Sequence, residues 1–219
     1  MGEIVFVRHG QASFGTDDYD RLSELGWRQA RWLGEHLAHE GRRFQVAASG
    51  NLRRHRETAE AIAEACGADD ALVLPGLNEM DFDTLLSDAY AAGVIPVSEF
   101  ADSDDFMREF PRIIKAWEAA SFSTEHEPYA DFCARVTEAV ESLMQDGRDV
   151  LIVSSGGPKA VMMRHILGLG AVKMAQVLLT IHNSSFSRFL VRNGNLLLGE
   201  FNATPHLAGP ERAHLRTYI

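Results

Sequence analysis

Apolar and polar positions alternate along the chain in blocks that differ in period. Residues 4–7 and 150–153 are continuously apolar, which is typical of strands buried on both faces of a sheet. Shorter apolar runs at 44–48 and 72–74 predict two further strands. Segments with helical spacing follow each of these runs. This strand–helix alternation predicts a parallel sheet with helices on both of its faces.

Several helix boundaries are marked by capping residues. Ser23 precedes a helical stripe of leucines and alanines within 25–37, so it is predicted to be an N-cap. Glycines at 41 and 67 are placed to end the first two helices. Further helices are predicted over 132–144 and from 156 to 167. Near the C-terminus, Asn193-Gly194 joins apolar segments at 184–191 and 196–201, which predicts a β-hairpin.

The middle of the chain, residues 80–130, has a less regular pattern. Acidic clusters alternate there with aromatic residues, and no repeat or low-complexity tract accompanies them. We interpret this stretch as a mostly helical insertion or cap lying over the site of one domain that spans 1–219. The expected fold is therefore α/β: a three-layer sandwich with a mainly parallel central sheet, helices on both faces and this helical insertion.

Composition narrows the class of function. The net charge of −10 disfavours non-specific nucleic-acid binding, and the 46% of hydrophobic residues suffice for a sizeable core. No apolar run is long enough to span a membrane, and no charged leader with an apolar core precedes the first strand. Cys66 and Cys133 lie in helical segments without C-x-x-C spacing, so we expect buried free thiols, no zinc site and a reducing cytoplasm.

The candidate chemistry begins where the first strand ends, at Arg8-His9-Gly10. Ligands of open α/β sheets bind just beyond the carboxyl ends of the strands. An imidazole can act as a nucleophile, and a guanidinium is well shaped to hold a phosphoryl group through paired hydrogen bonds. Arg8 and His9 are therefore predicted to border a ligand crevice.

Arg53, Arg54 and Arg56 occupy the start of the second predicted helix. The helix dipole disfavours cations at that end, so the cluster is favourable where an anion lies among them. One of the three arginines is expected to be only a surface residue.

Two more stretches end strands in the same way. Glu79 follows the third strand and could act as a general acid, with Asp81 and Asp83 as alternatives. After the 150–153 strand, Ser154-Ser155-Gly156-Gly157 opens a helix whose backbone N–H groups offer a further anion site.

Taken in order, these stretches resemble the histidine phosphatase superfamily, in its phosphoglycerate mutase-like branch, over nearly the whole chain. Arg8-His9-Gly10 matches the Arg-His-Gly motif, and Arg54 with Thr58 and Ala59 matches an Arg-x-x-x-Thr-Ala helix start. Glu79 matches the acid after the third strand. The later Asn-x-Ser and Asn-x-x-x-His-Leu motifs match Asn183/Ser185 and Asn202/His206/Leu207.

The resemblance implies phosphoryl transfer in two steps. His9 would attack phosphorus and become a phosphohistidine, while Arg8 and Arg54 hold the phosphoryl oxygens. Glu79 would protonate the leaving oxygen and then help to activate water. The expected phosphate-binding residues are Arg8, Arg54, Ser155, Gly156 and Gln11. No metal or other cofactor is expected, because the two guanidinium groups neutralise the charge.

One position departs from the family pattern. Ser155 stands where a second histidine is usual. His165 is expected on a helix surface, and His182, which precedes a strand, is the less favoured alternative for reaching the crevice. Loss of a transition-state donor costs about 100- to 1,000-fold in rate elsewhere. We expect turnover that is slow or adapted to unusual substrates, and a water or anion in the space that the histidine ring would occupy. Ser155→His should raise turnover if the site is otherwise intact and lower it if the site is rebuilt.

Four functions follow for testing. The leading one is a metal-independent phosphatase acting on a phosphate monoester, either a phosphorylated small molecule or a phosphoprotein. A catalytically degenerate phospho-ligand binding protein and a phosphoglycerate mutase are alternatives. A serine hydrolase is disfavoured because Ile152 stands where a nucleophile elbow at Ser154 requires glycine. No nucleic-acid or membrane partner is expected, and a homodimer is possible.

Overall fold

The central element of the computed structural model is a mixed sheet, and the structure describes residues 2–13, 19–68, 71–96, 100–122, 127–144 and 147–218. Its strand order over these ranges is β3-β2-β4-β1-β5-β6. The first four of these strands are mutually parallel, and β5 and β6 continue the sheet antiparallel to their neighbours. The strands are β1 Gly2–Arg8, β2 Val46–Ser49, β3 Leu72–Val73, β4 Asp149–Ser154, β5 Phe186–Arg192 and β6 Asn195–Ala203.

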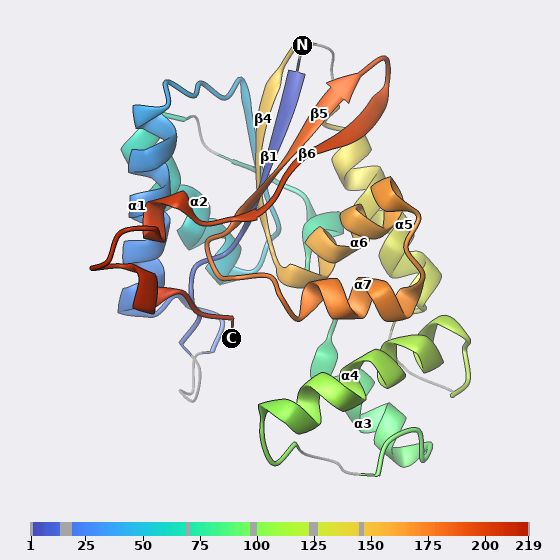
Figure 1. Cartoon of the computed structure of the whole chain (residues 1–219). Coiled ribbons are helices and arrows are strands. Elements are labelled where there is room, and N and C mark those ends of the chain that lie inside the picture. Colours follow the sequence, from blue (N-terminus) through green and yellow to red (C-terminus); the bar gives the residue numbers. More distant parts are fainter. Residues whose placement is uncertain are drawn as a thin grey trace.

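Helices cover both faces of this sheet (Figure 1). Helices α1 and α2 lie on one face, and α5 and α6 lie on the other. The α-helices are α1 Glu24–His39, α2 Arg53–Cys66, α3 Phe82–Ala91, α4 Ser103–Glu118, α5 Tyr129–Glu141, α6 Gly156–Leu167 and α7 Ala171–Leu178, with short 3₁₀ turns at Pro75–Leu77, Pro205–Leu207 and Ala213–Leu215. The predicted α/β sandwich with a mainly parallel sheet is confirmed.

The central strands β1 and β4 divide their side chains between two cores. Ile4 and Phe6 pack into the larger core with α3 to α7, while Val5 and Val7 pack into the smaller core with α1 and α2. Strand β4 repeats this alternation over Val150–Val153. Because successive side chains of a strand point to opposite faces, a strand buried on both sides must be apolar at every position. This requirement explains the two continuous apolar runs in the sequence.

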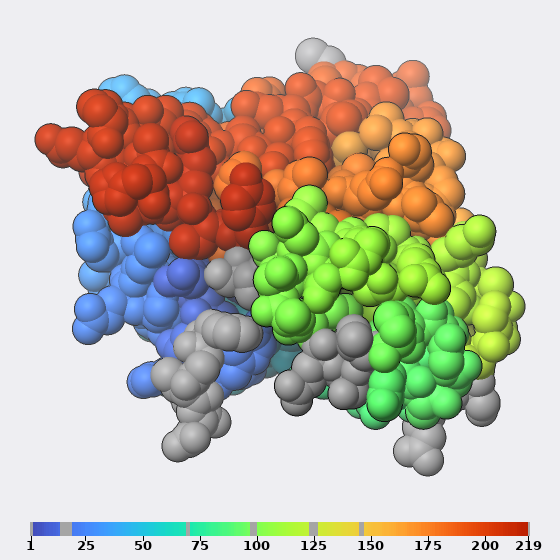
Figure 2. All heavy atoms as spheres, turned by 60° about the horizontal axis from the view of Figure 1, so that its bottom comes forward, coloured from blue at the N-terminus to red at the C-terminus, as the bar shows by residue number. Residues whose placement is uncertain are grey.

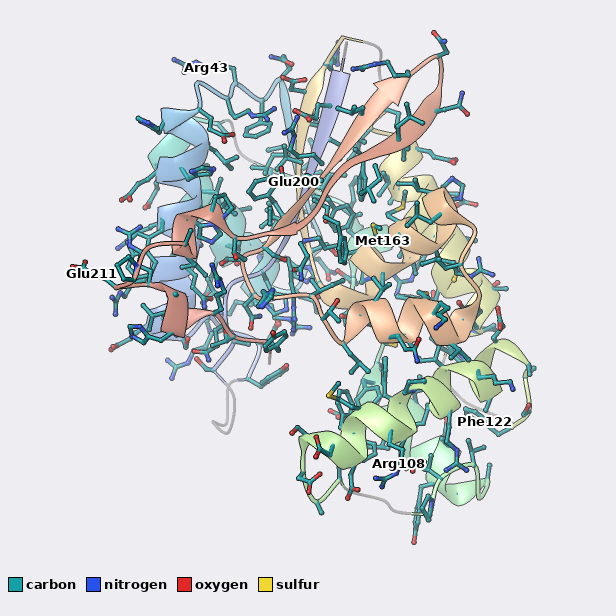
Figure 3. The ribbon with its side chains drawn as sticks, in the orientation of Figure 1. Arg43, Arg108, Phe122, Met163, Glu200 and Glu211 are labelled. Atoms are coloured by element: carbon teal, nitrogen blue, oxygen red, sulfur yellow. The ribbon has the colours of Figure 1, made fainter. Side chains whose placement is uncertain are left out.

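Helices α3 and α4 lie together at the end of the sheet toward which β1 runs (Figure 1). When this end is turned toward the viewer, residues of α3 and α4 lie on the visible surface (Figure 2). Met163 of α6 is buried in the interior, whereas Arg108 of α4 projects from the surface (Figure 3). Residues 82–118 thus supply helices at the same edge as the candidate chemistry.

The predicted helix cap at Ser23 and the predicted hairpin turn at Asn193-Gly194 are both present in the structure. Ser23 caps α1, since its Oγ accepts from Gly26 N at 3.0 Å. The Asn193-Gly194 turn has φ values of 51° and 74°, the left-handed conformation that two-residue hairpin turns require. Cys66 is buried as expected, but Cys133 is only partly buried because it packs at the edge of the larger core.

In the ranges that the structure describes, no helix is both long enough and apolar enough to cross a bilayer.

Candidate active site

His9 lies immediately beyond the carboxyl end of β1, and its backbone is held on both sides. Its N–H donates to Ser154 O at 2.8 Å, and its carbonyl oxygen accepts from Ser184 N at 3.0 Å. The imidazole Nδ1 lies 2.7 Å from Gly10 O. A carbonyl oxygen can only accept, so Nδ1 carries the proton and Nε2 retains its lone pair. Burial, with Arg54, Arg8 and His55 nearby, holds the pKa of His9 well below its usual value, which keeps the ring neutral.

Two guanidinium groups lie close to His9. Arg8 Nη1 donates to Ile181 O, while Nε of Arg8 and Nε of Arg54 are buried without a hydrogen-bond partner among the described residues. Burial lowers the pKa of Arg8 to about 10, opposed by the Glu79 carboxylate, so the group stays charged at neutral pH. Buried donors normally find acceptors, and two charged donors without one indicate an anion site.

Thr58 joins the start of α2 to the loop after β1. Its hydroxyl donates to Arg54 O at 2.7 Å and accepts from Gly10 N at 3.1 Å. This bridge explains physically why a threonine four residues after Arg54 belongs to the pattern. Arg54 is buried and its Nη1 donates to Asp20 at 2.6 Å, a carboxylate contact that no sequence pattern predicts.

The neighbouring arginines at the start of α2 are exposed. Arg53 pairs with Glu57 at 2.6 Å, and Arg56 lies on the surface. Only Arg54 of the three is buried beside His9. The expectation that one of the three arginines serves only at the surface was too cautious, because the 3.6-residue period turns both neighbours of the Arg54–His55 pair outward.

Glu79 lies against the N-terminus of α6. Its Oε2 accepts from Gly157 N at 3.0 Å and its Oε1 accepts from Met80 N at 3.1 Å. A Cβ on Gly157 would lie only 2.0 Å from Glu79 Oε1, so glycine is required for this contact. The two alternatives to Glu79 as general acid occupy other positions. Asp81 caps α3 by accepting from Thr84 N, and Asp83 is exposed.

Ser155 is fully buried at the N-cap position of α6 but makes no capping hydrogen bond. Its Oγ instead lies 2.6 Å from Nε2 of His55, a fully buried histidine in the first turn of α2. The His55 ring centroid is 5.7 Å from that of His9. A side chain of the protein itself therefore contacts Ser155, beside which we expected a water or anion.

The sequence motifs did not single out His55, although it directly follows Arg54 in the chain. The available signal was helical geometry: a residue adjacent to a buried arginine in the first turn can face the same site. Pairing with a serine 100 positions later in the chain could not be read from local patterns.

Residues of the C-terminal motifs hold the backbone of His9 and the segment that contacts Arg8. Asn183 Nδ2 donates to His9 O, and Ser184 Oγ lies 2.8 Å from His206 Nε2. Asn202 accepts from His182 N and donates to Thr180 O, which fixes the segment whose Ile181 carbonyl binds Arg8. Lys159, fully buried, donates to both oxygens of Ser185.

The remaining predicted residues are less directly engaged. The Gln11 side chain accepts from Ser23 Oγ at 2.8 Å, which ties it to the start of α1. Gly156 begins α6 with Arg8 Nε 3.8 Å from where its Cβ would stand. His165 is exposed as predicted, and the ring of His182 packs on Tyr218 with centroids 4.4 Å apart.

The serine hydrolase alternative loses support at Ser154. That hydroxyl is buried and donates to Leu77 O. Ser155 has a histidine partner, but Nδ1 of His55 has no partner within the described ranges, so the third group that orients a catalytic base is not in place there. Within the same ranges, no group of three or more His, Cys, Asp or Glu residues gathers in a metal-binding arrangement.

A neutral histidine close to two arginine side chains, at the carboxyl edge of the parallel strands of an α/β sandwich, is suited to binding an anion such as a phosphoryl group. The family model described as histidine phosphatase superfamily (branch 1) matches residues 4–94 and 95–204. The chain belongs to this superfamily.

Individual relatives include both mutases and phosphatases. A probable phosphoglycerate mutase of Yersinia pestis is 26% identical over 197 residues, covering 86% of this chain and 84% of the relative. An Entamoeba histolytica phosphoserine phosphatase variant in complex with phosphoserine superimposes with a TM-score of 0.68 at 18% identity, covering 94% of this chain and all of that one. A mycobacterial glucosyl-3-phosphoglycerate phosphatase gives 0.63 at 23% identity, covering 92% and 99%. Such structural likenesses support the fold.

Proposed function

We propose that this protein is a phosphatase that hydrolyses phosphate monoesters through a phosphohistidine formed on His9. The 2.7 Å contact between His9 Nδ1 and Gly10 O supports this most directly, because it indicates which ring nitrogen carries the proton. The Nδ1–H of His9 is held by Gly10 O, so the Nε2 lone pair is available beside Arg8 and Arg54, whose Nε atoms have no partner in the described part of the chain. A neutral nucleophile beside two cations suits attack on a phosphate dianion.

In the first step the Nε2 lone pair of His9 attacks phosphorus and the bond from phosphorus to the ester oxygen breaks. Glu79, as the carboxylic acid, gives its proton to the departing oxygen. Arg8 and Arg54 hold the equatorial oxygens, where the transition state carries its charge. Throughout, the Nδ1–H bond to Gly10 stays in place and stabilises the positive charge that develops on the ring.

In the second step a water molecule attacks the phosphohistidine from the side that the alcohol has left. Glu79 takes a proton from this water, the P–N bond breaks, and the electron pair returns to Nε2. Inorganic phosphate leaves, and Glu79 is protonated again for the next cycle. The two guanidinium groups supply the charge neutralisation that metal ions give other phosphoryl-transfer enzymes.

The substrate is a phosphorylated small molecule or a phosphoprotein, and the named activities of the relatives favour the small molecule. A panel of phosphorylated sugars, phosphoglycerates, phosphoserine and phosphopeptides, with p-nitrophenyl phosphate as the generic ester, identifies the class. Transfer of phosphate between positions of a phosphoglycerate, faster than its hydrolysis, would support the mutase alternative instead.

Rapid acid-free quenching with a ³²P-labelled substrate tests the intermediate. Label should remain on wild-type protein in alkali and be lost in acid, and His9→Ala should carry no label and show no turnover. Tight binding of phosphate esters without label or hydrolysis in the wild type would favour the degenerate binding protein. Turnover retained in His9→Ala would place the chemistry on another residue.

A further inference from the structure

The pairing of His55 with Ser155 has no part in the steps above, although it lies beside the nucleophile. His55 Nε2 is 2.6 Å from Ser155 Oγ, and both side chains are buried. A serine at a helix N-cap usually accepts from a backbone N–H of the first turn. Ser155 makes no such bond, and the N–H of Gly157 serves Glu79 instead. The Ser155 hydroxyl thus contacts His55 instead of a backbone N–H in the first turn of α6.

The backbone around His55 is shaped to admit its ring. Gly50, at the end of β2, lies so close that a Cβ there would be 2.3 Å from His55 Nδ1 and 3.0 Å from Cε1. Any other residue at position 50 would therefore displace the imidazole. The ring is held in one place between Gly50 and Ser155, which is what a positioned group requires.

The protonation state of His55 follows from its surroundings. Burial, reinforced by Arg54, lowers the pKa of His55 well below the usual value, so the ring is neutral and carries one proton. Nδ1 has no hydrogen-bond partner among the described residues. A buried N–H without an acceptor is rarer and more costly than an unpaired acceptor, so the proton belongs on Nε2. Nε2–H then donates to Ser155 Oγ and leaves the serine proton free to point elsewhere.

We propose that Ser155 and His55 together supply the phosphoryl-oxygen donor that this superfamily usually draws from a single histidine. Ser155 Oγ–H donates to an oxygen of the phosphoryl group on His9, and His55 Nε2–H donates to Ser155 Oγ. Donation to a hydroxyl oxygen polarises it and strengthens the bond that its own proton makes. His55 is a positioning residue that acts through Ser155. This inference rests on the proposed phosphatase function.

The decisive experiment is a double-mutant cycle of Ser155→Ala, His55→Leu and the two combined. His55→Gln is added as the conservative variant, and His165→Gln, at an exposed histidine, as the control. Far-UV circular dichroism and Tm establish folding. Steady-state kcat and KM for p-nitrophenyl phosphate are measured together with inhibition by orthovanadate, which resembles the transition state, and by inorganic phosphate.

Ser155→Ala should lower kcat about 100-fold, as for loss of one transition-state donor. His55→Leu should lower it about 10-fold, as for one hydrogen bond of ordinary net strength. The double variant should be no slower than Ser155→Ala, because His55 acts through the serine. His55→Gln should recover most of the loss, since its amide N–H lies near the position of Nε2, and His165→Gln should match the wild type.

Vanadate inhibition separates catalysis from a structural role. In Ser155→Ala and His55→Leu, the vanadate Ki should rise in step with the loss of kcat, while the phosphate Ki changes much less. A wild-type kcat in His55→Leu, or the same His55→Leu loss in the Ser155→Ala background, would overturn the inference.

Moving the imidazole from position 55 to position 155 provides a second test. Because the His55 ring already lies against Ser155 Oγ, Ser155→His alone should crowd it and lower kcat. Adding His55→Ala should relieve the crowding and give a faster enzyme than Ser155→His. A gain of turnover from Ser155→His alone would show open space beside the serine and contradict the pairing.

The proposed function and this inference fail in different ways. If His9 forms no phosphohistidine and no ester is hydrolysed, the function fails, and calorimetric binding of orthovanadate to the same variants still tests the pair. Equal vanadate affinity across the variants then overturns the inference. If His9 is phosphorylated but the His55 and Ser155 variants turn over normally, the function stands and the inference alone falls.

Discussion

Gly157→Ala should separate the activity of this protein from its stability. The added Cβ would stand 2.0 Å from Glu79 Oε1 and 2.8 Å from Met80 Cε. Glu79 must therefore withdraw, and its bond from Gly157 N is weakened or lost. Gly157 is the second residue of α6 and has no positive φ, so alanine is compatible with its backbone. Alanine is favoured over glycine inside helices by about 0.5–1 kcal/mol, which offsets part of the cost of that hydrogen bond, so Tm should fall only slightly.

The size of the catalytic effect follows from the displacement. Real Cβ contacts stay beyond 3.0 Å, so the carboxyl group must move by about 1 Å. A misplacement of about 1 Å can cost about 100-fold in rate. The loss should appear with alkyl phosphates, whose leaving oxygen needs the Glu79 proton. It should be much smaller with p-nitrophenyl phosphate, whose leaving group departs as a stable anion.

The assay compares kcat on phosphoserine and on p-nitrophenyl phosphate for wild type, Gly157→Ala and Glu79→Gln. Gly170→Ala is the matched control, because it lies at the start of another helix with nothing within 4 Å of its added Cβ. Unchanged hydrolysis of the alkyl ester by Gly157→Ala would refute the reasoning that Glu79 acts from this position. Equal losses on both esters would point to general distortion of the site.

Two further outcomes follow from burial and charge. Arg54→Ala should raise KM for phosphate esters far more than Arg53→Ala or Arg56→Ala, because Arg54 alone of these three arginines is buried beside His9. Inhibition constants for inorganic phosphate check this: phosphate should inhibit Arg54→Ala much more weakly than the other two variants. Equal inhibition constants in all three variants would contradict the prediction. Burial lowers the pKa of His206 to about 3, and His36, Arg212 and Arg216 add to the effect. As the pH falls below about 6.5, His206 therefore becomes protonated in the unfolded chain but stays neutral in the folded protein. Stability from this group is present above that pH and is lost toward pH 3, by about 2 kcal/mol between pH 7 and pH 5. Urea unfolding at the two pH values should show a smaller drop for His206→Gln than for wild type, and parallel drops would mean that His206 titrates normally in the folded state.

The sequence by itself determined the layers of this fold. Continuous apolar runs at 4–7 and 150–153 arise because central strands of a sandwich are buried on both faces, and this requirement is local to each strand. Capping at Ser23 and the turn at Asn193-Gly194 are likewise local, since each depends on backbone conformations a few residues apart. Residues at the carboxyl ends of parallel strands share one edge, so His9, Glu79 and Ser155 could be expected together.

Only the tertiary structure decided how those residues are used. The position of Glu79 at the N-terminus of α6 depends on a contact between segments far apart in the chain, and so does the contact of Arg54 with Asp20. The clearest case is Ser155, which the sequence presented as a missing histidine. Helix α2 brings His55 to within 2.6 Å of the serine hydroxyl, because Gly50 leaves room for the ring. Such pairings depend on packing between elements, where a single absent Cβ decides what fits, and no local pattern records them.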